Sequence, residues 1–189
     1  MKFGDAGAFL GTLLFVQLGC VSGQAKEAKV FLLEDTGHNQ WCAYNNETTW
    51  NTTVQDSGAM TVATLSYSND HLLQIDVTET DESGDWTVYD HYFLNDGGEI
   101  VKLSRMINIL PGDRSVLQIF SMSDGKATKT ATTEKELSTG RLLRSPKSVW
   151  LPKLPIRTGT KLFPFSALLG RPGLTTSSKL CAQSPAPRK

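Results

Sequence analysis

The chain has 189 residues, with 19 basic and 19 acidic side chains, 39% hydrophobic residues, 8% aromatic residues, 16 glycines and 8 prolines. This length is enough for one packed domain, and the aromatic content and balanced charge exclude a wholly disordered chain. The sequence has no glycine period, no sustained heptads and no repeated long apolar runs. It is therefore not a collagen, a coiled coil or a protein with several membrane spans.

The first residues have the pattern of a secretory signal peptide. Residues 8–18 form an uncharged apolar run of eleven, which is too short for a bilayer span of ~20 residues but fits the core of a signal peptide. Small residues follow, and we predict a signal peptide over residues 1–23, with cleavage after Gly23 or after Ala25. An alternative is a lipoprotein signal that ends at Cys20 and anchors the protein to lipid. Either reading predicts an exported protein, periplasmic or extracellular, with no transmembrane span in the mature chain.

The cysteine count agrees with export. Removal of residues 1–23 leaves two cysteines, Cys42 and Cys181. An even pair in an oxidising compartment favours a disulfide, and we predict one between these two residues; the alternative is two free thiols.

Two N-glycosylation sequons lie close together, Asn46-Glu47-Thr48 and Asn51-Thr52-Thr53. In a eukaryotic secretory pathway both asparagines are acceptors for glycans. In a bacterium the same residues indicate only an exposed polar loop, so the sequence leaves glycosylation open.

Charge and proline divide the chain near residue 140. Residues 24–140 hold 18 acidic and 8 basic side chains, a net of −10, whereas residues 141–189 hold 10 basic side chains, no acidic ones and seven of the eight prolines. We therefore predict a β domain over residues 24–144 and a basic, Pro-rich C-terminal segment over residues 145–189. Prolines prevent a long helix or a central strand. We expect an extended segment that packs on the β domain through Trp150, Phe163 and Phe165 and neutralises its acidic charge.

The β domain shows the alternation of half-buried strands, separated by turn residues. The strongest turn signal is Asn95-Asp96-Gly97-Gly98. The fold class is mainly β, an antiparallel meander of about six to eight strands that forms a curled sheet or a small barrel. One short helix is expected over residues 134–144. The predicted strands are 60–68, 73–77, 86–94, 99–110, 116–122 and 126–134, preceded by two short apolar segments at 30–33 and 41–44.

No motif of nucleophilic catalysis or phosphate binding is present, and we predict no catalytic residue. Asp90 and His91 are adjacent on one strand, so their side chains point to opposite faces and cannot share a site. The acidic loop at residues 80–85 does not have the spacing of a known calcium loop, and we read it as a solvated turn. We therefore expect no metal and no cofactor.

The apolar face of the meander carries the candidate ligand-binding residues. They are Tyr67, Leu73, Ile75, Trp86, Val88, Leu103 and Ile107, and we expect Leu117 and Ile119 on the same face. The function that this pattern favours is a non-enzymatic binding or interaction protein. One alternative is a carrier of an apolar ligand or lipid in the curled sheet, and another is a hydrolase that uses His91 or His71. The expected partner is an apolar small molecule or a protein; nucleic acid is excluded by the acidity of the body.

Overall fold

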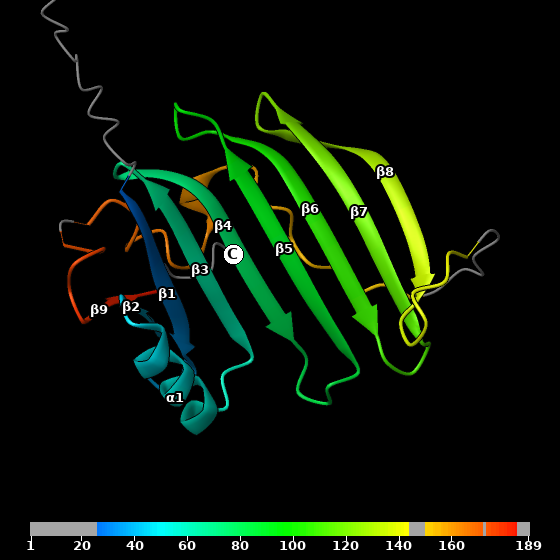
Figure 1. The fold of residues 1–189 in the computed structure, drawn as a ribbon, viewed down its shortest axis with the longest axis horizontal. Coiled ribbons are helices and arrows are strands. Elements are labelled where there is room, and N and C mark those ends of the chain that lie inside the picture. Colours follow the sequence, from blue (N-terminus) through cyan, green and yellow to red (C-terminus); the bar gives the residue numbers. More distant parts are fainter. Residues whose placement is uncertain (1–25, 144–149, 172, 185–189) are drawn as a thin grey trace, which may run out of the picture.

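The structure is a computed structural model that describes residues 26–143, 150–171 and 173–184. The predicted signal peptide over residues 1–23 and the predicted boundary at residues 144–145 lie outside or at the edge of this range. The described residues form one antiparallel sheet of nine strands, in the order β8-β7-β6-β5-β4-β3-β1-β2-β9, with one α-helix (Figure 1). The mainly β, antiparallel fold is therefore confirmed. The elements are β1 (Glu27–Asp35), a 3-10 turn η1 (Thr36–His38), β2 (Gln40–Tyr44), α1 (Glu47–Ser57), β3 (Thr61–Ser68), β4 (His71–Thr80), β5 (Trp86–Leu94), β6 (Ile100–Ile109), β7 (Arg114–Ser123), β8 (Lys126–Glu136), a second 3-10 turn η2 (Thr160–Leu162) and β9 (Lys179–Gln183).

Strands β3 to β8 form the predicted meander, in which each strand pairs with the next one along the chain. The turn that begins at Asn95 has the backbone conformation and hydrogen bond that its Asn and Gly residues favour. Gly98 has a φ of +75°, a conformation that an L side chain rarely adopts. The Asn95 side-chain oxygen accepts a hydrogen bond from the Glu99 backbone N–H at 2.9 Å. The turn between β7 and β8 uses Asp124 and Gly125, both at positive φ.

The two short apolar segments that precede the meander are β1 and β2. β1 lies between β3 and β2, so β3 pairs with β1 and not with β2, the strand that precedes it in the sequence. β9, which the sequence did not predict, pairs with β2 and places Cys181 directly opposite Cys42. The predicted disulfide joins these two residues across a sequence separation of 139.

The helix prediction was wrong. Residues 134–136 belong to β8, and the chain then turns back so that Leu142 pairs with Lys135. The α-helix is instead α1, in the Asn- and Thr-rich stretch expected to be a loop. Asn46 caps its first turn, because its side-chain oxygen accepts a hydrogen bond from the Thr49 backbone N–H at 2.9 Å. Gly58 ends it in the left-handed conformation at φ +62°.

The sheet stays open and only slightly curved, with β8 and β9 as its two edges. Of the two predicted forms, the structure therefore has the sheet and not the barrel. Three β-bulges leave Leu73, Val101 and Thr130 without an opposite residue, on β4, β6 and β8 respectively. These strands run in the same direction, and each bulge lies in the first half of its strand. The bulges therefore bend one end of the sheet.

The main core lies between the sheet and the C-terminal segment. We call this side of the sheet the inner face. Phe163, Phe165 and Leu168 are fully buried in one cluster with side chains from eight strands, and Arg157 pairs with Glu79 at 3.3 Å. The predicted anchor Trp150 is 67% exposed, so that part of the prediction was wrong. In Figure 1 the segment runs behind the sheet.

Helix α1 covers part of the opposite side, which we call the outer face. It packs on β1 and β2, where the rings of Phe31 and Trp50 have centroids 5.2 Å apart. The Trp50 indole N–H donates to the Leu32 carbonyl at 3.1 Å. In the described part of the chain, no helix lies over β4 to β8 on this face (Figure 1).

Two adjacent residues of the C-terminal segment test its role as a cover. Phe163 is 0% exposed and its neighbour Leu162 is 52% exposed. Phe163→Ala should lower the free energy of unfolding by about 3–5 kcal/mol, because it leaves a cavity in the core. Leu162→Ala should change it by less than about 0.5 kcal/mol. Urea unfolding followed by tryptophan fluorescence measures both, and equal effects would contradict this assignment of the core.

Candidate functional site

The inner face holds six of the seven predicted ligand-binding residues, all except Leu73, and the C-terminal segment occupies much of it. Ile75 and Leu103 are buried in the core with Phe163 and Phe165. Val88 and Ile107 are buried in a neighbouring cluster with Trp86, against which Leu151 and Leu154 of the segment pack. Tyr67 is partly buried, and Leu73 is 40% exposed because it is a bulge residue. A ligand on this face would therefore compete with the chain's own side chains.

Two adjoining cavities remain at one rim of the inner face. A cavity of about 530 Å³ lies between the β5–β6 turn, the β7–β8 turn and residues 158–161. A second, of about 200 Å³, shares Gly98 and Thr160 with it and is also lined by His71. The larger cavity is lined by Glu99, Asp124 and Lys161 as well as by apolar residues. It is not the purely apolar pocket that a lipid carrier needs.

A buried ion pair fixes the C-terminal segment to the inner face. Arg105 donates two hydrogen bonds to Asp90, each at 2.7 Å, and donates two more to the backbone carbonyls of Leu154 and Pro155, at 3.1 and 3.0 Å. The Tyr92 hydroxyl donates to Asp90 at 3.1 Å. Burial, together with the Asp90 charge, raises the pKa of Tyr92 to about 12. Because the network is buried and its donors are used within the fold, it is a structural anchor.

The sequence contains a signal for this anchor that is absent from the predicted site residues. Asp90 stands at an inward position between Val88 and Tyr92, and Arg105 stands at one between Leu103 and Ile107. Opposite charges at inward positions of two adjacent strands predict a buried pair.

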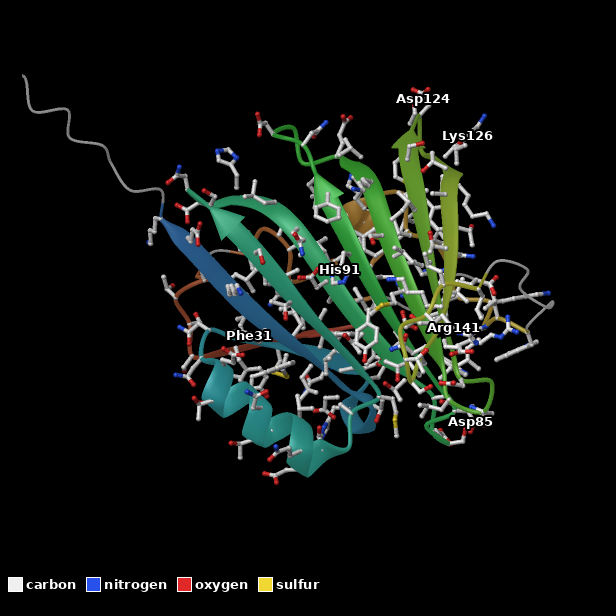
Figure 2. All side chains as sticks on the ribbon, turned by 45° about the vertical axis from the view of Figure 1, so that its right-hand side comes forward. Phe31, Asp85, His91, Asp124, Lys126 and Arg141 are labelled. Atoms are coloured by element: carbon white, nitrogen blue, oxygen red, sulfur yellow. A yellow bond between two sulfur atoms is a disulfide. The ribbon has the colours of Figure 1, made fainter. Side chains whose placement is uncertain are left out.

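The outer face carries a second pair, between His91 and Asp76. The His91 Nδ1 lies 2.6 Å from the Asp76 Oδ1, and the Gln74 side-chain amide donates to the same oxygen at 2.6 Å. Figure 2 shows His91 on the open part of this face, away from Phe31, which lies under α1. The hydrogen bond to Asp76 raises the pKa of His91 above its usual value, partial burial opposes this, and the Asp76 charge adds to the rise.

Ser104 extends this pair into a row across three strands. Asp76 on β4 is directly opposite His91 on β5, and His91 is directly opposite Ser104 on β6. Opposite residues have Cβ atoms ~4.5–5.5 Å apart. A carboxylate, an imidazole and a hydroxyl therefore stand in the order found in nucleophilic hydrolases, although on an open face. His71, the other predicted catalytic histidine, lies at the start of β4 and is exposed.

Apolar side chains surround this row. Tyr89, Met106 and Leu117 are opposite one another on β5, β6 and β7, and Ile119 is opposite Ser104. The prediction that Leu117 and Ile119 share the inner face with Leu103 was wrong. Val116 and Phe120 are the inward residues of β7, so the alternation is shifted by one. We define the outer patch as Tyr89, Phe93, Met106, Leu117 and Ile119. Leu117 is 36% exposed, and the other four are partly buried.

The acidic loop between β4 and β5 is closed by its own hydrogen bonds. The Asp81 carboxylate accepts from the Ser83 hydroxyl at 2.5 Å and from the Trp86 backbone N–H at 2.9 Å. No group of three or more His, Cys, Asp or Glu side chains in residues 26–143, 150–171 and 173–184 has an arrangement that could hold a metal ion. Within the same residues, no helix is long and apolar enough to cross a bilayer.

Comparison with protein-family models, with curated proteins and with solved structures found no match to this chain. We therefore infer function from the two faces of the sheet.

The His91–Asp76 pair predicts a specific pH dependence. The pKa of His91 in the folded protein should exceed 6.5, because the carboxylate stabilises the imidazolium. Its stabilising contribution should be present below pH ~6.5 and disappear as the pH rises through the folded value. NMR titration of the imidazole signals measures this pKa. Asp76→Asn should lower it, whereas Asp81→Asn, in the turn, should leave it unchanged; equal effects would contradict the pairing.

Proposed function

We propose that this chain is an exported, non-enzymatic binding protein that recognises a protein partner through the outer patch. The observation that carries the proposal is the unequal covering of the two faces. The inner face is packed with the chain's own C-terminal segment, whereas the outer face has a helix only over β1 and β2 in the described residues. Apolar side chains on β5 to β7 are therefore left at the surface.

The composition of the outer patch supports a macromolecular partner. Tyr, Phe and Met are enriched at the centres of protein interfaces, and charged residues are rare there. The patch lies on an open, slightly curved sheet rather than in a cleft, and small molecules usually bind in concave sites. The broad surface of another protein therefore fits this open face better than a small molecule does.

Polar side chains within and beside the patch would set the orientation of the partner. Asp76 and His91 lie inside the row, and Lys102 lies over the Phe93 ring with its amine 5.3 Å from the centroid. Since charges of both signs are present, specificity would depend on their arrangement more than on net charge.

Export is the second part of the proposal. The Cys42–Cys181 disulfide supports it, because disulfides persist in oxidising compartments. The signal peptide expected over residues 1–23 would direct the chain into the secretory pathway.

Leu117→Lys tests the outer patch. A photo-crosslinking residue placed at position 117 should capture a partner in the compartment to which the protein is exported. The same residue placed at the exposed position of Gln55, on α1, should not. With the purified partner, Leu117→Lys should raise the Kd at least about tenfold, because it places a charge in an apolar contact. Gln55→Lys should leave the Kd unchanged.

The competing outcomes of this experiment are distinct. Equal capture at positions 117 and 55 would contradict the assignment of the patch. Capture only of a second copy of the chain, with a dimer that Leu117→Lys dissolves, would replace the foreign partner by self-association.

The row Asp76, His91 and Ser104 favours a second candidate, a serine hydrolase. In that mechanism His91 takes the Ser104 proton as Ser104 attacks an acyl carbonyl, and His91 then gives the proton to the leaving group as its bond to the carbonyl carbon breaks. Water hydrolyses the acyl-serine, and Asp76 orients the imidazole. The described geometry supplies the order of the groups but no cleft around them, which is why binding is our first proposal.

A fluorophosphonate probe separates the two functions. If the chain is a hydrolase, the probe should label Ser104, and both Ser104→Ala and His91→Ala should abolish labelling. Ser115→Ala, on the same face of β7, should not affect it. Absence of label on the wild-type protein would end the hydrolase alternative and leave the binding proposal intact.

A further inference from the structure

Both sequons lie at helix α1, which the fold places on the outer face. Asn46 is the residue that caps the helix, and Asn51 is in its fifth position. Both side chains are exposed. We propose that α1 is a glycan-bearing helix, N-glycosylated at Asn46 and Asn51.

The capping geometry of Asn46 is compatible with a glycan. The cap uses only the side-chain oxygen, Oδ1, which accepts the Thr49 N–H. N-glycosylation forms a bond between the side-chain nitrogen, Nδ2, and the anomeric carbon of an oligosaccharide carried on a lipid pyrophosphate. The lipid pyrophosphate leaves and Nδ2 loses one proton. The Asn46 oxygen keeps its carbonyl character, so the helix retains its cap after modification.

Asn51 is also free to carry a glycan. Within the described residues, no hydrogen bond engages its side chain, and it is exposed. The helix is held on the sheet by Trp50 and Val54, which pack against Phe31 and its neighbours. A glycan on either asparagine therefore displaces no packed side chain.

The disulfide provides an independent observation that points to the same compartment. Cys42 is four residues before Asn46, and both Cys42 and Cys181 belong to the cluster under α1. The lumen in which eukaryotic cells form disulfides is also the one in which they add N-glycans. The inference depends on the export part of the proposed function and is independent of the outer patch.

Glycans on α1 would mark one end of the outer face. The helix lies over β1 and β2, and the outer patch lies over β5 to β7. Glycans attached to α1 would therefore lie on the outer face, at the end away from the outer patch. They would not cover the inner face or its rim cavities.

The test is site-specific mass spectrometry of the full chain secreted from a eukaryotic cell line. Peptide:N-glycosidase converts a glycosylated Asn to Asp, so the wild-type protein should show Asp at positions 46 and 51 after digestion. Thr48→Ala should remove the first modification while keeping the Asn46 cap, and Thr53→Ala should remove the second. Thr52→Ala leaves both sequons intact and should keep both glycans.

Each other outcome has a defined meaning. Secreted protein with unmodified Asn46 and Asn51 overturns this inference and leaves export standing. Modification at one position only overturns the claim for the other. Protein retained in the cytosol with residues 1–23 attached overturns both export and glycosylation.

Discussion

The packing of the C-terminal segment on the inner face is the contact on which the rest of this structure depends. Phe163 lies against Tyr92 with ring centroids 5.0 Å apart, and Phe165 lies against Trp41 at 4.9 Å. Each large side chain that is fully buried contributes ~1.5–3 kcal/mol. An open sheet has two faces and needs a cover on at least one of them to form a core. In this chain that cover is a Pro-rich segment instead of a layer of helices.

Two polar or covalent constraints hold that segment in place, and neither is the charge pairing expected from the sequence. Arg105 and Asp90 are buried charges, which are costly unless every donor is satisfied. A proline-rich extended chain leaves backbone carbonyls without hydrogen-bond donors. Arg105 donates hydrogen bonds to two of these carbonyls, those of Leu154 and Pro155. The disulfide then ties the end of the segment, through β9, to β2. For a closed loop of this length the chain-entropy model gives roughly 4–5 kcal/mol. The basic charges of the segment add one direct ion pair to the body among residues 150–171 and 173–184, Arg157 with Glu79.

The predictable parts of the fold were those set by local residues. Alternating apolar residues and Asn-Gly-type turns identified β3 to β8, two short apolar segments marked the positions of β1 and β2, and the cysteine count identified the disulfide. Helix α1 was missed because it contains only two apolar residues and depends on its Asn46 cap. β9 was missed because its partner, β2, is far away in sequence. The candidate site needed the strand register: a shift of one residue moves Leu117 and Ile119 from one face to the other, and only pairing across strands brings Asp76 to His91.

The open edges explain why the outer patch, and not strand addition, is the surface that we assign to a partner. An unpaired edge strand invites pairing with another chain, and natural sheets block it with lysines, bulges and short covers. β8 has all three. Lysines lie along its length (Lys126, Lys129 and Lys135), Thr130 forms a bulge, and Leu142 pairs with Lys135 and so covers the end of the strand. β9, at the other edge, has only five residues and is held by the disulfide. The edges are therefore protected against other strands, whereas the apolar residues of β5 to β7 on the outer face have no comparable protection in the described chain. On the outer face, apolar side chains surround a short polar row and the sheet edges on both sides are blocked, so binding is directed to the face and not to the edges.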